Sequence, residues 1–190
     1  EFFVNHKKEK RKIFIISTKN NIYKGIVSLS NIDNRGKNCD IAVLTDTKIE
    51  PLLAPYAGLE AVALISDFAF TKLKLRRIDC NFKRSQKNWF QRMEILGYKY
   101  FFRSRHKVKS YSSIMTDKKF GDERIGYSAY FSSLNYEDFK FLKKKRGKIW
   151  DNLNSMKKRI TKLPKKSFWD IYDNFLDNDK RNYYNKIHSL

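Results

Sequence analysis

Cysteine, histidine and acidic residues are scarce in this chain of 190 residues, and it contains no long apolar run. Its two cysteines, Cys39 and Cys80, lie in strand-like stretches and are too few for a disulfide framework, so we expect buried, reduced thiols and a cytoplasmic protein. The histidines are far apart in the sequence and lack the spacing of metal ligands, so we expect no metal site. No run approaches the ~20 apolar residues that a membrane span needs, so no span is expected.

The shortage of acidic residues leaves a strongly basic chain. Lys and Arg number 41 against 20 Asp and Glu, which gives a formal net charge of +21 at pH 7. Such a charge attracts nucleic acid, phosphorylated small molecules or acidic membrane surfaces. AT-rich coding is an equal alternative, because Lys, Asn, Ile, Phe and Tyr are abundant together. Hydrophobic residues make up 41% of the chain and aromatic residues 15%, so we expect a packed core rather than a disordered tail.

Strand-like and helix-like stretches follow one another along the first 134 residues. Three β-branched and aromatic stretches in a row suggest an antiparallel meander, and a strand that follows a helix suggests a parallel crossover. We therefore predict an α/β fold with a mixed sheet that splits into a V. The strands are predicted at 12–18, 20–33, 39–46, 76–82, 98–102 and 125–134, and the helices at 57–73 and 85–97.

The composition changes after about residue 136. "FKFLKKKRGK" is a run of positive charge, for which a solvated helix end is the simplest interpretation and binding of RNA or acidic lipid the alternative. Apolar residues then recur at helical spacing from 148 to 187 and are interrupted at Pro164, which predicts two helices whose apolar faces pack on each other, on the sheet or on a partner. We expect a domain over 1–136 and a basic helical extension over 137–190.

Three strings in this order resemble those of the GNAT N-acetyltransferases, and most of all the branch that acetylates protein N-termini and amino sugars. They are "IYKGIVSLSNIDNRGKNCDIAV", "AGLEAVALISDFAFTKLKLRRIDC" and "QKNWFQRMEILGYKYFFRSR". The resemblance covers roughly residues 12 to 134. It implies a GNAT-like sheet and the use of acetyl-CoA as cosubstrate. It also implies that the elements that complete the family's acceptor pocket precede residue 1, so we expect an incomplete chain.

The resemblance implies a set of site residues. A strand would hydrogen-bond the pantetheine arm of acetyl-CoA through its backbone, and the turn before the next helix would hold the pyrophosphate on backbone N–H groups. Asp40 matches a strand carboxylate that serves as base in some relatives, although a surface aspartate is the simpler interpretation. The cofactor-binding positions carried over are Ile41, Ala42, Val43, Leu44, Leu53, Ala54, Tyr56, Ala57, Gly58, Leu59 and Gln86.

The chain departs from the family pattern in the turn and at the general acid. Leu53 and Tyr56 replace the family's basic residue and first glycine, and Pro55 removes one N–H donor. The family's frequent catalytic tyrosine matches Met93, which cannot donate a proton and fits a core-facing side with Trp89. The cofactor-binding motif is therefore degenerate.

Three functions follow from these observations. The first is an acetyl-CoA-dependent N-acetyltransferase that acts on a primary amine of an amino sugar, protein or peptide, with an acidic acceptor favoured by the net charge. The second is a catalytically degenerate GNAT-fold binding protein. The third is a basic nucleic-acid-binding protein, whose binding would be weak and sequence-independent because only dispersed charge supports it.

Overall fold

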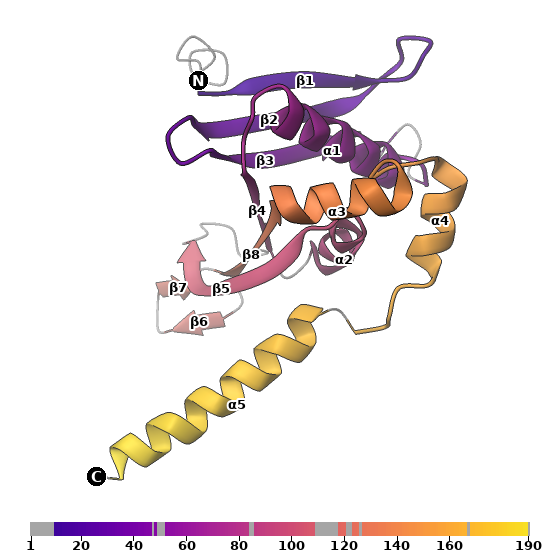
Figure 1. Cartoon of the computed structure of the whole chain (residues 1–190). Helices are drawn as coiled ribbons and strands as arrows, with labels where there is room; N and C mark the ends of the chain where they lie inside the picture. Colours follow the sequence, from indigo (N-terminus) through magenta and orange to yellow (C-terminus); the bar gives the residue numbers. More distant parts are fainter. Residues whose placement is uncertain are drawn as a thin grey trace.

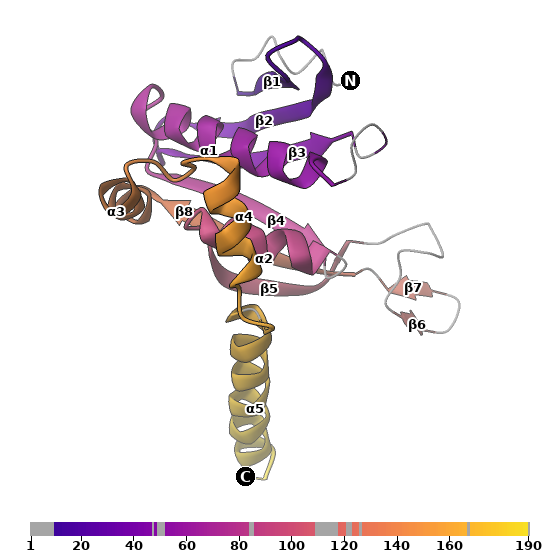
Figure 2. The same cartoon turned by 90° about the vertical axis from the view of Figure 1, so that its right-hand side faces the viewer.

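The computed structural model describes residues 10–46, 48, 52–83, 86–108, 118–120, 123–125, 127–166 and 168–189. Its strands are β1 (Lys12–Ser17), β2 (Tyr23–Asp33), β3 (Asn38–Thr45), β4 (Arg77–Lys83), β5 (Lys99–Val108), β6 (Lys118–Phe120), β7 (Glu123–Ile125) and β8 (Tyr127–Asn135). Its helices are α1 (Ala54–Thr71), α2 (Lys87–Ile95), α3 (Tyr136–Arg146), α4 (Leu153–Thr161) and α5 (Phe168–His188). Figures 1 and 2 show their arrangement.

The central sheet is mixed. Its six strands run in the order β1-β2-β3-β4-β8-β5, and β6 and β7 form a separate hairpin. Strands β1, β2 and β3 pair antiparallel, β3 and β4 pair parallel, and β8 pairs antiparallel with both β4 and β5. The helix between β3 and β4 makes the crossover that a parallel pair needs. The predicted mixed α/β fold, with its meander and crossover, is confirmed.

The hydrophobic core lies between the sheet and two helices that cover the same face (Figure 2). Alternate residues of β3 and β4 point into it, because side chains of a strand alternate between the two faces of the sheet. Helix α2 adds the apolar side predicted from its sequence, with Phe90 and Met93 buried and Trp89 partly buried. On the opposite face of the sheet Ile15 and Leu44 are 72% and 66% exposed. This face of the sheet is therefore open.

The chain after β8 contributes to the same core. Phe139 from α3, Trp150 from the segment before α4 and Met156 from α4 are buried in it, so α3 and α4 pack on the sheet domain. Most of the charge run predicted as a solvated helix end lies in helix α3, in which Phe139 is buried. Both helices predicted between 148 and 187 are present. The division of the chain at residue 136 stays a prediction.

Helix α5 runs away from the body of the molecule (Figures 1 and 2). Its first turns contact the sheet domain, where the ring of Tyr172 lies 5.7 Å from that of Tyr100. Apolar side chains farther along remain exposed, among them Phe175 and Ile187. Among the helices of the described residues, none has both the length and the apolar character needed to cross a lipid bilayer.

The start of α1 differs from the prediction. The sequence predicted a turn over Leu53–Leu59 and a helix from about Ala57, whereas the helix begins at Ala54. Pro55 is compatible with the first helical turn, because the N–H that proline lacks would have no partner within the helix there. The residues from Tyr56 to Leu59 are therefore helical.

Candidate functional site

The sheet splits between β3 and β4. The parallel ladder joins Asn38 to Arg77 and ends where Asp40 meets Asp79, although β3 continues to Thr45 and β4 to Lys83. Past Asp40, β3 remains paired with β2 on its other edge. The predicted V-shaped split is confirmed. From Ile41 to Leu44, the edge of β3 that faces the split has backbone groups with no ladder partner on β4. Such an edge can form hydrogen bonds with the amides of an extended ligand.

Asp40 lies at the apex of this split, on the open face of the sheet. Its Oδ2 accepts a 2.6 Å hydrogen bond from the side-chain amide of Asn31. The ladder places Asp79 next to it, and Arg77 holds that second carboxylate with Nε 2.8 Å from Oδ1 and Nη2 2.6 Å from Oδ2. This pairing raises the pKa of the Arg77 guanidinium, which therefore stays charged. The site has two carboxylates and one guanidinium, a local charge opposite in sign to that of the whole chain.

The first turn of α1 offers fewer hydrogen-bond donors than an ordinary helix start. The N–H groups of Tyr56 and Ala57 both donate to the carbonyl of Leu53, at 2.9 and 3.0 Å, and Pro55 has no N–H. The helix has neither a side-chain cap nor an acidic residue in its first turn. The dipole at this end still favours an anion, but the backbone alone makes a weak anion site.

Gly58 is buried against side chains rather than open to a ligand. A Cβ at this position would lie 2.9 Å from Cγ2 of Thr45 and 2.9 Å from the ring of Trp89. The absence of a side chain at Gly58 thus allows the indole of α2 and the end of β3 to pack against α1. A phosphate that approached Gly58 itself would have to displace Trp89.

Two cations that the sequence analysis missed lie beside the start of α1. The guanidinium of Arg92 from α2 is 5.9 Å from the ring centre of Tyr56, and the ammonium of Lys157 from α4 is 5.5 Å from it. They supply the positive charge that the turn lost with the family's basic residue. No local pattern could have indicated Lys157, because α4 reaches this place only by folding back on the domain.

The structure brings some of the predicted residues together and separates others. Leu53, Ala54, Tyr56 and Ala57 line one cavity of about 650 Å³ between α1 and β1, which Leu153 also lines. Gln86 is exposed at the N-cap of α2, just beyond the end of β4. Asp40 points to the other face of the sheet. None of the residues that line the cavity comes from β3 or β4, so the cavity itself is not the split between these strands.

Neither thiol nor the most buried tyrosine can take part in proton transfer or nucleophilic attack. Burial raises the pKa of Cys39 to about 12 and raises that of Cys80 further. Burial also raises the pKa of Tyr98 well above its usual value, and its hydroxyl lies 3.0 Å from Oγ of Ser66. Met93, which stands at the position of the family's tyrosine, is 1% exposed. Within the described part of the chain, no group of three or more His, Cys, Asp or Glu residues is arranged to hold a metal ion.

Solved structures of the spermidine/spermine N-acetyltransferase SpeG from Vibrio cholerae have the same architecture. The structure with manganese ions superposes with a TM-score of 0.59 at 12% identity, covering 76% of this chain and 75% of that chain. The complex with CoA and spermine gives a TM-score of 0.58 at 12% identity, covering 72% and 73%. The chain has the GNAT acetyltransferase fold. No protein-family model and no curated protein sequence matches it.

The split between β3 and β4 is thus part of a sheet with the GNAT fold. At this level of identity the similarity concerns the fold, and the residues at the site must be judged by their own chemistry. The branch suggested by the sequence, which acetylates protein N-termini and amino sugars, stays a prediction.

Proposed function

We propose that this chain is an acetyl-CoA-dependent N-acetyltransferase that acetylates a primary amine. The observation that carries the proposal is the split between β3 and β4 with Asp40 at its apex. A thioester in the split would meet a carboxylate on the open face, where an acceptor can approach. Acetyl-CoA enters this reaction as the cosubstrate.

Backbone groups would bind the pantetheine end of acetyl-CoA, and charged side chains would bind its phosphate end. The pantetheine arm carries amides, and the unpaired edge of β3 from Ile41 to Leu44 offers matching backbone groups. The phosphates would lie near the start of α1, where Arg92 and Lys157 supply charge-assisted contacts in place of the missing backbone donors. We therefore assign the phosphate contacts to these two side chains, with a smaller contribution from the first turn of the helix.

Asp40 is the proposed base. The amine must lose a proton as its nitrogen attacks the thioester carbonyl, and a carboxylate within reach, directly or through one water, can take it. The new C–N bond replaces the C–S bond, and the sulfur leaves as a thiolate that is then protonated. The amide of Asn31 orients the carboxylate of Asp40 through its 2.6 Å hydrogen bond.

The local charge favours a cationic acceptor. Asp40 and Asp79 lie side by side on the open face, and among the described residues Arg77 is the cation that pairs with Asp79. A polyamine or another amine with a second positive charge suits this place better than an acidic acceptor, which was favoured by net charge alone. Spermidine and spermine, the amines after which the fold relatives are named, are of this kind.

The second candidate function is a GNAT-fold binding protein without catalysis. Two observations favour it. The carbonyl of Leu53 already accepts hydrogen bonds from two N–H groups at the start of α1, and the indole of Trp89 packs against Gly58. This alternative predicts that the chain neither binds CoA nor transfers acetyl groups.

Calorimetric titration with CoA, followed by an acetyl-transfer assay on spermidine, glucosamine and a short peptide, separates the two functions. We expect CoA binding, and transfer that is fastest to spermidine. Asp40→Asn should lower kcat at least about 100-fold, because it removes the base yet keeps an oxygen for the bond from Asn31. Asp79→Asn is the matched control: it should raise KM for spermidine and leave kcat within about threefold. Absence of CoA binding, or equal kcat in the parent and Asp40→Asn, would overturn the proposal.

A further inference from the structure

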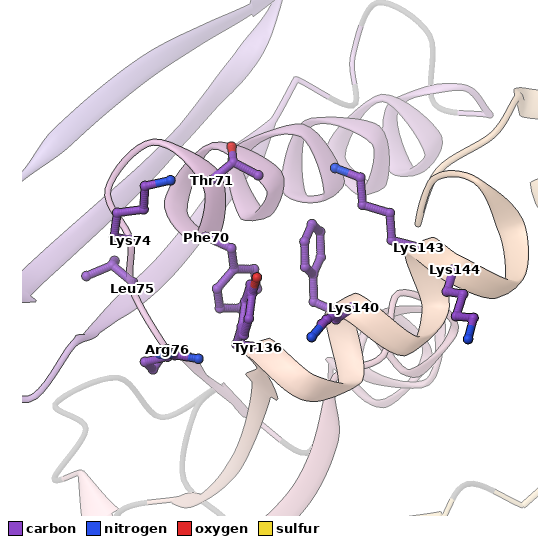
Figure 3. Close-up of a pocket in the computed structure, with 10 residues that line it drawn as sticks. Phe70, Thr71, Lys74, Leu75, Arg76, Tyr136, Lys140, Lys143 and Lys144 are labelled. Carbon is purple, nitrogen blue, oxygen red and sulfur yellow. The ribbon is translucent and has the colours of Figure 1, made fainter.

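A second cavity lies at the far end of α1, between that helix and α3 (Figure 3). Its volume is about 500 Å³, within the range of ~300–1,000 Å³ typical of small-molecule sites. Apolar side chains and cations line it together. The apolar ones are Phe70, Leu75, Tyr136 and Phe139, and the cations are Lys74, Arg76, Lys140, Lys143 and Lys144.

The apolar residues form a continuous aromatic cluster. The ring of Phe70 lies 4.8 Å from that of Phe139 and 5.8 Å from that of Tyr136. Phe70 and Phe139 are buried, whereas Tyr136 is half-buried. Of these three rings Tyr136 is the one that a ligand can reach, and a ligand with a ring could pack against it, which a small inorganic anion would not.

The cations around the cavity outnumber the carboxylates that neutralise them. Arg76 pairs with Glu137 at 3.7 Å, and Lys143 pairs with Asp67 at 2.7 Å. Lys74, Lys140 and Lys144 are exposed and make no ion pair with any residue the structure describes. In Figure 3 the ammonium ends of Lys74 and Lys143 point toward each other from opposite sides of the cavity. A ligand with about three negative charges, such as a diphosphate ester, would balance the unpaired charge here.

The backbone holds Lys74 at the cavity in an unfavourable conformation. Its φ is +56°, a region that glycine and asparagine adopt far more readily than lysine. The N–H groups of Leu73 and Leu75 donate to the carbonyls of Phe68 and Ala69, at 3.2 and 3.1 Å, and so cap the negative end of α1. A lysine thus occupies the position where a helix ordinarily ends on glycine, and its charge lies at the cavity.

This cavity is separate from the proposed acetyl-transfer site. The 18 residues of α1 span about 27 Å, and the phosphate contacts assigned to Arg92 and Lys157 are at the opposite end of the helix, while Asp40 lies on the other face of the sheet. None of the residues that line the 650 Å³ cavity at the start of α1 lines this one. One CoA molecule bound along the split would leave the second cavity empty.

We propose that this cavity binds a nucleoside diphosphate. Lys74, Lys140 and Lys143 would hold the two phosphates, with Lys143 exchanging Asp67 for the ligand, and the nucleoside would pack on Tyr136 at the edge of the aromatic cluster. The two phosphates balance the unpaired charge, and the ring accounts for the apolar lining.

Calorimetric titration of the full chain with GDP, guanosine, pyrophosphate and a twelve-nucleotide thymidine strand tests this assignment. We expect GDP to bind at one site, about tenfold more tightly than pyrophosphate, and guanosine to bind more weakly still. Lys74→Gly and Lys140→Ala should each weaken GDP binding about five- to tenfold. Lys72→Ala removes an exposed lysine of the same turn and should change it less than twofold.

Two further measurements keep the result interpretable. Lys74→Gly should raise the thermal midpoint of the chain, because glycine adopts a positive φ without strain, so weaker GDP binding could not come from unfolding. Arg92→Ala should leave GDP binding unchanged, since Arg92 lies at the other end of α1. Equal GDP affinity in the parent, Lys74→Gly and Lys140→Ala would overturn the proposal. Pyrophosphate binding as tight as GDP, or a thymidine strand that binds more tightly and is lost in the same variants, would overturn it too.

Discussion

Replacing Gly58 with alanine tests whether packing closes the start of α1. Two effects oppose each other in this variant. Alanine in a helix interior is favoured over glycine by ~1 kcal/mol, while overfilling a packed site costs ~1–3 kcal/mol. The new Cβ would lie 2.9 Å from Thr45 and 2.9 Å from the ring of Trp89, closer than real Cβ contacts. Because both neighbours must shift, we expect Gly58→Ala to lower the free energy of unfolding by about 1 kcal/mol.

The assay is urea unfolding followed by far-ultraviolet circular dichroism, which does not depend on tryptophan fluorescence. Measuring the parent, Gly58→Ala, Trp89→Leu and the double variant closes a double-mutant cycle. Trp89→Leu removes the ring atom that the new methyl group would meet. The alanine at position 58 should then be better tolerated, with a coupling energy of roughly 0.5–1.5 kcal/mol.

One result would refute this reasoning. If Gly58→Ala alone stabilises the chain by the full helix-propensity gain of ~1 kcal/mol, the indole does not pack on Gly58. The start of α1 would then be open, and a phosphate could approach the glycine as the family resemblance implies. A coupling energy near zero would lead to the same conclusion.

Three further predictions concern the helices around this site. Met156→Ala should destabilise the chain by about 2–5 kcal/mol in the same urea assay, because its side chain is fully buried in the core; a smaller effect would mean that α4 is only loosely attached. Arg92→Ala and Lys157→Ala should each weaken CoA binding about tenfold in calorimetry, and unchanged affinity in both would remove them from the phosphate contacts. Asp151→Asn should lower stability at pH 7 by about 1 kcal/mol. Partial burial opposes the charge of Asp151, but hydrogen bonds from the Asn152 N–H and the Arg159 guanidinium lower its pKa below the usual value. This contribution is therefore present above about pH 4 and disappears as the pH falls through the lowered pKa. Parent and variant should unfold alike near pH 2, and a difference that persists there would contradict the assignment.

Local patterns predicted the fold well because each signal lay within one element. Alternation of apolar residues in β1, β2 and β3 and the apolar side of α2 require only the neighbouring residues of the chain. The buried position of Phe139 in α3 escaped prediction because the lysines that follow it mark the segment as a charge run, although Phe139 faces the core and Leu142 packs against it. The earlier start of α1 escaped it because Pro55 was interpreted as part of a turn, whereas the first turn of a helix accepts proline.

The site was predictable only in part. Asp40 was selected because the family resemblance places a carboxylate at this strand position. The pairing of β3 with β4 shows in addition that Asp40 lies where the sheet splits. Its neighbour Asp79, however, is brought beside it by a parallel pairing across a whole helix. Arg92 and Lys157 meet at Tyr56 from two helices far apart in the chain. Contacts of this kind depend on tertiary packing, which no local pattern contains.

The two cysteines give the chain a built-in reporter of opening. Cys39 and Cys80 lie on the two strands that diverge, one on each side of the split, and both are buried with a raised pKa. A thiol reagent reacts with the thiolate, so it can modify these residues only in molecules whose core has opened. Since the chain has no other thiol, the rate of labelling at each cysteine measures how often each strand leaves the core. If β3 and β4 separate independently, the two rates will differ, and a ligand held between the strands will slow both.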